Sequence, residues 1–272
     1  MPETKAKGGA PGGVASLPMY DWPEIRAWTD ALWLALRTQL QQRGIAAPDH
    51  LERPEDPEPL WLDPSLVLSQ TCGHPYANQL AGKVTLIGAP TYPGIGAKPG
   101  HYFSVLVARK MDQPSNLGDL SNKRFAFNMA QSQSGFAAPV RLLADAGCHS
   151  RPKPFATGAH RASIQAVAQG QADWAAIDAV TWELAKRHEP AAQELDVFAV
   201  TPETPGLPLI SSVRFYSQAS IIADAIDAAI DDLSSDVRDH VLPSGLKRFT
   251  PADYAPLARP LPIAAALPGM AG

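Results

Sequence analysis

The sequence has few cysteines and no strong excess of charge. Only Cys72 and Cys148 occur among 272 residues, which is too few for a disulfide framework, and their spacing fits no metal-binding motif. Charged residues make up 18% and the formal net charge is -4. Because Lys and Arg form no long run, the chain lacks the basic surface that nucleic acids and anionic membranes require. We therefore expect no nucleic-acid partner, no metal and no cofactor.

Long apolar runs and the common catalytic signatures are also missing. No segment approaches ~18 uninterrupted apolar residues, and the N-terminus lacks the apolar stretch that an export signal needs. This predicts a cytoplasmic protein if the sequence is complete, and a periplasmic one if a signal has been removed or is supplied otherwise. The motifs GxGxxG, GxxxxGK[ST], HExxH, CxxC and GxSxG are absent.

What the sequence does contain is an alternation of apolar strand patterns with helical patterns of ten or more residues. This order predicts an α/β protein whose mostly parallel sheets are flanked by helices. Residues 1–13, rich in Gly, Pro and Lys, predict a disordered arm. The expected strands are 14–20, 66–70, 84–90, 101–109, 124–129, 172–177 and 195–202, and the expected helices are 24–44, 137–147, 161–170, 179–188 and 220–233.

We expect two such sheets, each in its own lobe. The chain is expected to cross between the lobes near residues 108–113 and 200–205. Residues 14–109 and 203–272 then form lobe I, and residues 110–202 form lobe II. Two crossings make a hinge, with a cleft between the lobes.

The stretch SQSG stands where a strand gives way to a helix. Ser132, Gln133 and Ser134 offer side-chain donors beside the free N–H groups of the helix start, and Gly135 allows a ligand to approach the backbone. Together with the helix dipole, this arrangement suits a tetrahedral oxyanion. The alternative is plain N-capping by serine, which stabilises a helix by ~1 kcal/mol.

Other candidates also follow predicted strands, where ligands of open α/β sheets bind. His160, at a second helix start, is a candidate donor to the same anion or a simple surface residue. Asp178 either accepts hydrogen bonds from a ligand or caps the next helix. Cys72 is a pocket thiol, or a nucleophile if His74 or His160 lies in reach. The remaining candidates for ligand binding are Tyr20, Asp21, Thr71 and Tyr102.

In this order the segments resemble the substrate-binding proteins of ABC importers for phosphate, phosphite and phosphonates, which have the type II periplasmic binding protein fold. The most specific pieces are LGDLSNKRFAFNMAQSQSGFAAPVRLL and TGAHRASIQAVAQGQADWAAIDAVTWELA. The resemblance implies two lobes that close on a ligand. One residue departs from the pattern, because phosphonate binders commonly have threonine where this chain has Gln133.

The resemblance also implies roles for the candidates. Ser132, Gln133 and Ser134 would hold the oxyanion, His160 would donate to it and Tyr102 would cover it. Asp178 would face the other end of the ligand. Thr71 and Cys72 would line the opposite lobe.

These observations favour a monomeric, non-catalytic binding protein that takes a small anionic, phosphonate-like ligand for an ABC permease. The alternative is a cytosolic enzyme or metabolite sensor on the same fold that uses Cys72, His160 and Asp178. A third hypothesis is an interaction domain with an empty cleft.

Overall fold

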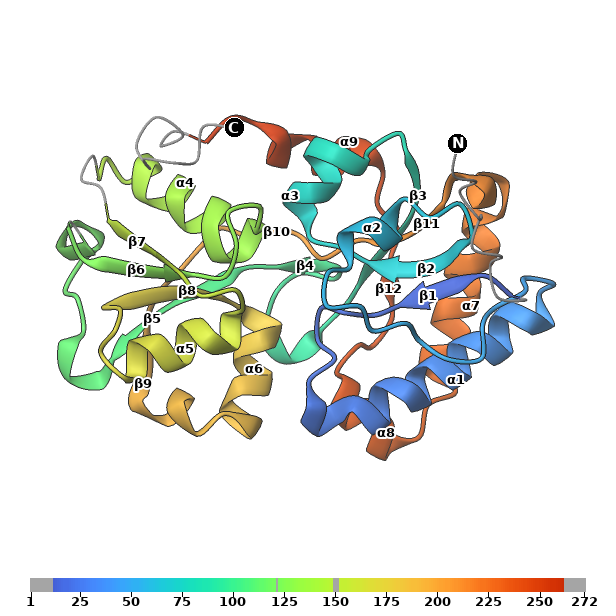
Figure 1. The fold of residues 1–272 in the computed structure, drawn as a ribbon, viewed down its shortest axis with the longest axis horizontal. Coiled ribbons are helices and arrows are strands. Elements are labelled where there is room, and N and C mark those ends of the chain that lie inside the picture. Colours follow the sequence, from blue (N-terminus) through green and yellow to red (C-terminus); the bar gives the residue numbers. More distant parts are fainter. Residues whose placement is uncertain (1–11, 121, 149–151, 262–272) are drawn as a thin grey trace, which may run out of the picture. The chain divides into compact units, whose positions relative to one another are not determined.

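The structure, a computed structural model, describes residues 12–120, 122–148 and 152–261 (Figure 1). Most of the predicted disordered arm lies outside the described residues. The described chain divides into two compact units. Unit 1 comprises 12–71, Leu80–Thr91 and Leu207–Thr250, and unit 2 comprises Cys72–Gln79, Tyr92–Gly206 and 251–261.

Unit 1 is built on a five-stranded sheet with the order β1-β2-β11-β3-β12. Strand β11 runs antiparallel to its neighbours β2 and β3, whereas β1 is parallel to β2. The sheet is therefore mixed. Its strands are β1 (Val14–Ser16), β2 (Leu66–Gln70), β3 (Val84–Pro90), β11 (Leu209–Ser212) and β12 (Leu246–Lys247), and its helices are α1 (Arg26–Gln42), α2 (Glu58–Trp61), α7 (Ala219–Asp231) and α8 (Ser235–Val241).

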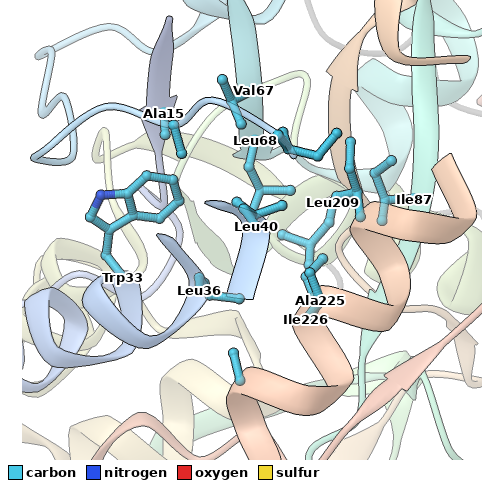
Figure 2. Packing of buried hydrophobic residues seen from close by; sticks show 14 of the residues in the cluster. Ala15, Trp33, Leu36, Leu40, Val67, Leu68, Ile87, Leu209, Ala225 and Ile226 are labelled. Carbon is cyan, nitrogen blue, oxygen red and sulfur yellow. The ribbon is translucent and has the colours of Figure 1, made fainter. Parts of the chain in front are cut away.

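The core of unit 1 forms where α1 and α7 meet the sheet. Trp33, Leu36 and Leu40 recur at helical spacing on α1 and are at most 3% exposed. Figure 2 shows them beside Ala225 and Ile226 of α7 and beside residues of β2, β3 and β11. Burying each large apolar side chain contributes about 1.5–3 kcal/mol, so this cluster stabilises the unit strongly.

Unit 2 is built on a second mixed sheet with the order β7-β6-β8-β5-β9. Strand β6 is parallel to β7 and β8, and β5 is antiparallel to β8 and β9. A separate two-stranded ribbon joins β4 to β10. The strands are β4 (His101–Tyr102), β5 (Ser104–Arg109), β6 (Arg124–Phe127), β7 (Lys153–Ala156), β8 (Trp174–Asp178), β9 (Leu195–Val200) and β10 (Thr204–Pro205), and the helices are α3 (Gly73–Pro75), α4 (Ala138–Asp145), α5 (His160–Ala168), α6 (Ala179–His188) and α9 (Pro251–Tyr254).

Alternation along the strands of unit 2 gives its sheet two different faces. Phe125, Phe127 and Trp174 point to one face and pack with Val140 and Leu143 of α4. Helix α5 also contacts β5, β6 and β8, but none of its residues belongs to that cluster, so it covers the opposite face (Figure 1). The carboxyl ends of β6 and β8 thus lie next to helices that start there.

The expected α/β fold with helices flanking the sheets is confirmed, but the sheets are mixed rather than mostly parallel. Strand β11 in unit 1 and β5 in unit 2 each lie between strands of the opposite direction, and the edge strand β12 of unit 1 is also antiparallel to β3. Periodicity reveals which face of a strand is buried but not its direction, so these reversals could not be predicted from local sequence patterns.

The division into units also differs from the expected one. Residues 92–109, expected in lobe I, belong to unit 2, because β5 pairs with β8 and β9. Residues 72–79, 203–206 and 251–261 belong to unit 2 as well, so the division of the chain has five boundaries rather than two crossings. Within the described residues, no helix combines the length and apolarity needed to cross a membrane.

Candidate functional site

The SQSG stretch forms a tight polar turn at the carboxyl end of β6 in unit 2. Ser132 caps the π-helical turn Gln133–Ala137, which continues into α4, and its Oγ accepts from the Gly135 N–H at 3.0 Å. Such π-helical turns are frequent at functional sites. The residues of the stretch are nearly buried: Ser132 is 3% exposed, Gln133 1% and Ser134 5%. The predicted serine cap therefore exists, and Ser132 provides it.

Close packing at this turn leaves no free space for a Cβ atom on Gly135. A Cβ atom at this position would lie 1.9 Å from Oδ1 of Asn128 and 3.0 Å from Cε1 of His160. The sequence analysis did not single out Asn128, although it directly follows β6. Its Oδ1 is buried and has no hydrogen-bond partner within the described chain.

His160 reaches the turn from the start of α5. Its Nε2 lies 2.9 Å from Oγ of Ser134, at hydrogen-bonding distance. Burial lowers the pKa of His160 to about 4, and the nearby Ala176 carbonyl opposes this only in part. The imidazole is therefore neutral at neutral pH and provides one donor and one acceptor.

Tyr102 brings a buried hydroxyl to the same place. It is 2% exposed, and its hydroxyl has no hydrogen-bond partner of normal geometry among the described residues. Burial is the main cause that raises the pKa of Tyr102 well above its ordinary value, and Cys72 and Asp178 add to the rise. The Ser134 hydroxyl is close enough to lower the pKa of Tyr102 in part. Tyr102 thus supplies a neutral O–H group beside Ser134.

Cys72 lies directly against the turn. Its Sγ accepts the backbone N–H of Gln133 at 3.2 Å. Burial raises the pKa of the thiol, and the backbone N–H groups of Gln133, His74 and Ser134 lower it in part. Sequence reasoning expected Cys72 on the opposite lobe, but the structure places it in the same unit as the SQSG turn.

Asp178 is the last residue of β8 and caps α6. Helix capping was the predicted alternative to ligand binding for this residue. Its Oδ1 accepts from the N–H groups of Val180 and Thr181 at 2.8 and 3.0 Å. Its charge also raises the pKa values of both Cys72 and Tyr102, so the carboxylate lies close to them. Asp178 therefore caps α6 and also lies beside the candidate site.

The side chain of Gln133 is held by a residue that the sequence analysis missed. Arg141, two turns along, donates from Nη1 to Oε1 of Gln133 at 3.3 Å. Its Nη2 donates to the carbonyls of Leu257 and Arg259 at 3.1 and 2.7 Å. The spacing of eight residues was the available signal, since i and i+8 share one face of a helix. Ser104 was also missed, and its hydroxyl donates to the Ser134 carbonyl at 2.9 Å.

The other three candidates belong to unit 1 and are described there. Asp21 is tied by ion pairs, with Oδ2 2.5 Å from Nε of Arg53 and 3.9 Å from Nε of Arg26. Tyr20 precedes it. Thr71 is fully buried, and its Oγ1 has no hydrogen-bond partner among the residues that the structure describes. Unit 2 alone brings together Cys72, Tyr102, Ser132, Gln133, Ser134, Gly135, His160 and Asp178.

The geometry around Cys72 and His160 does not resemble an activated nucleophile. A catalytic thiol has a lowered pKa and a histidine base, whereas the pKa of Cys72 is raised and that of His160 is lowered. Nδ1 of His160 is buried and donates no hydrogen bond to a carboxylate in the described chain, as a Ser–His–Asp triad would require. Nor does the described chain gather three His, Cys, Asp or Glu side chains that could hold a metal ion.

Solved structures of two-lobed periplasmic binding proteins share this fold. PhnD1 from Prochlorococcus marinus in complex with methylphosphonate is 17% identical, with a TM-score of 0.67 over 91% of this chain and 96% of that one. A binding protein component of an ABC phosphonate transporter from Pseudomonas aeruginosa is 16% identical, with a TM-score of 0.68 over 91% and 85%. A Xanthomonas citri protein bound to ATP is 12% identical, with a TM-score of 0.68 over 91% and 96%.

At these identities the similarity shows the fold alone, which is that of type II periplasmic binding proteins. No curated protein matches the sequence. The family described as ABC transporter, phosphonate, periplasmic substrate-binding protein matches residues 71–256, which is more than half of the chain and includes the whole SQSG turn. The chain therefore belongs to the family of periplasmic substrate-binding proteins of phosphonate ABC transporters.

Proposed function

We propose that this protein binds a small tetrahedral oxyanion, a phosphonate or phosphate-like ligand, at the SQSG turn and delivers it to an ABC permease without catalysis. One observation carries the proposal. The buried Tyr102 hydroxyl, which has no hydrogen-bond partner of normal geometry among the described residues, lies beside Ser134, whose own hydroxyl is held by the neutral His160. A buried hydroxyl without a partner is costly unless a ligand completes its hydrogen bonds.

The turn supplies the electrostatic part of the site. It opens the helical segment that continues as α4, where the helix dipole favours negative charge. The hydroxyls of Ser132 and Ser134 lie 3.5 Å apart, so they can serve neighbouring oxygens of one ligand. The family supports a phosphonate, because its members are substrate-binding proteins of phosphonate importers.

A ligand panel tests the proposal directly. Phosphate, phosphite, alkylphosphonates, aminoalkylphosphonates, sulfate and small carboxylates are compared by thermal shift. A ligand at about 100 times its Kd stabilises the folded state by ~2.7 kcal/mol, which raises Tm by several degrees at ~2–4 °C per kcal/mol. If no tetrahedral oxyanion raises Tm, the proposal is wrong.

Two substitutions of Ser134 locate the site. Ser134→Asp puts a carboxylate where the anion is expected to lie and should abolish binding, while Ser132 still caps the turn. Ser134→Ala removes one donor without adding charge and should weaken binding about tenfold, the effect of one hydrogen bond to a charged group. Circular dichroism of both variants checks the fold. Undiminished binding by Ser134→Asp would show that the anion binds elsewhere.

A further inference from the structure

The sulfur of Cys72 accepts a backbone hydrogen bond that an anion-binding turn would otherwise donate to its ligand. The N–H of Gln133 points at Sγ at 3.2 Å. The backbone N–H groups of His74 and Ser134 also lower the pKa of the thiol in part. Backbone N–H groups at the start of a helix are the usual donors to an oxyanion. In this protein a neutral thiol lies where a ligand oxygen would otherwise accept them.

Hydroxyl groups of two residues remain as donors for a ligand. Tyr102, 2% exposed and next to both Cys72 and Ser134, carries a hydroxyl without a hydrogen-bond partner of normal geometry in the described chain. Ser134 supplies a second hydroxyl, fixed by His160. A hydroxyl differs from an N–H because it also accepts a hydrogen bond. These groups can therefore serve a protonated oxygen as well as an ionised one.

The charge around these hydroxyls disfavours a second negative charge. Asp178 is the acidic group near Tyr102 that carries charge, since burial keeps the Cys72 thiol and the Tyr254 hydroxyl protonated. Arg141 lies nearby, but its guanidinium is bound by the carbonyl oxygens of Gln133, Leu257 and Arg259. A dianion would meet a carboxylate and would lack the backbone donors needed to balance its charge.

We propose that Cys72 determines selectivity by holding the backbone donors of the turn, so that the site prefers a monoanionic, singly protonated oxyanion to a dianion. This inference rests on the proposed function and specifies its ligand class. It applies to alkylphosphonates, which lose their second proton near neutral pH, and it predicts discrimination against sulfate, which has no proton to lose.

The titratable groups around the thiol remain in one protonation state over the range that tests this inference. His160 has a pKa of about 4, and burial also lowers the pKa of His74. Burial raises the pKa values of Cys72, Tyr76, Tyr102 and Tyr254. Asp178 and Arg141 are the other charged groups near the thiol. From about pH 6 to about pH 8, the ionisation of the ligand is therefore the change that matters.

The experiment uses the full chain and isothermal titration calorimetry with methylphosphonate and sulfate. Wild-type affinity for methylphosphonate should fall as pH rises through the second ionisation of the ligand, approaching about tenfold per pH unit above it. Cys72→Ala frees the Gln133 N–H and should flatten this profile. It should also raise sulfate affinity about tenfold, the effect of one hydrogen bond to a charged group.

Cys72→Ser is the matched control, because its Oγ can accept the same N–H groups and should preserve the wild-type profile. Circular dichroism establishes that each variant is folded. Parallel pH profiles for wild type and Cys72→Ala, with unchanged sulfate affinity, would overturn this inference while leaving the proposed function intact. Absence of oxyanion binding at every pH in all three proteins would overturn both.

Discussion

Burial of His160 links the candidate site to stability in acid. The folded protein holds the pKa of this residue at about 4, below its ordinary value of 6.5. Above pH 6.5 the ring is neutral in both states and contributes no pH dependence. As pH falls from 6.5 to about 4, the unfolded chain takes up a proton that the folded protein does not. Acid therefore favours the unfolded state through this residue.

The expected loss is about 3 kcal/mol of unfolding free energy by about pH 4. Urea unfolding at several pH values measures it as the difference between wild type and His160→Gln, which cannot titrate. His50→Gln, an exposed change in unit 1, serves as the control. If the difference between wild type and His160→Gln is constant over this range, His160 is not held neutral by the fold.

Close approach between the end of β6 and the turn before α4 depends on Gly135. In Gly135→Ala, the new Cβ would overlap Oδ1 of Asn128, which is 1.9 Å away. Overpacking of this kind costs about 1–3 kcal/mol, and it should also displace the donors of the turn. We expect lower unfolding free energy and weaker oxyanion binding, measured by urea unfolding and calorimetry.

Gly94→Ala is the matched control, since a Cβ there has no neighbour within 4 Å among the residues described. It should change neither quantity appreciably. If Gly135→Ala behaves like Gly94→Ala, the turn has room that the structure does not show.

The elements themselves were largely predictable, whereas their directions and contacts were not. The apolar runs predicted β2 and β3 with their observed bounds, and helical spacing predicted α1 and α7. Strand pairing depends on partners distant in sequence, so the reversals of β5 and β11 could not be read from local patterns. For the site, the sequence indicated the SQSG turn and His160.

Side-chain directions in the site were also beyond local reasoning. Gln133 was expected to contact the ligand, but its amide accepts from Arg141 and its N–H meets Cys72. Both contacts join residues that the fold, not the local sequence, brings together. The residue that bears most on the turn's backbone donors is thus Cys72, whose sulfur accepts a hydrogen bond from the Gln133 N–H.

Ligand binding by the whole molecule can reveal which residues of unit 1 take part. Hydrogen exchange with and without methylphosphonate should slow in unit 2 at the turn around Ser134 and at the start of α5, because a ligand suppresses local opening. If Thr71, with its buried unpartnered hydroxyl, also contacts the ligand, exchange at the end of β2 should slow as well. The α8 segment of unit 1 is the internal control.

Protection confined to β2 and α8, with none at the turn, would contradict the assignment of the anion site to unit 2.

Domain boundaries were less predictable from the sequence than strands and helices. The expected division put Tyr102 in lobe I. Pairing of β4 with β10 puts this residue in unit 2.

Unit 2 is completed by the end of the described chain. Tyr254 is fully buried there, and its hydroxyl donates to the Gly206 carbonyl at 2.8 Å, while Arg141 binds the carbonyls of Leu257 and Arg259. Synthesis proceeds from the N-terminus, and domains generally fold as units. The ribosome must therefore release residues 251–261 before unit 2 can complete its packing, so a nascent chain that stalls earlier lacks the finished candidate site.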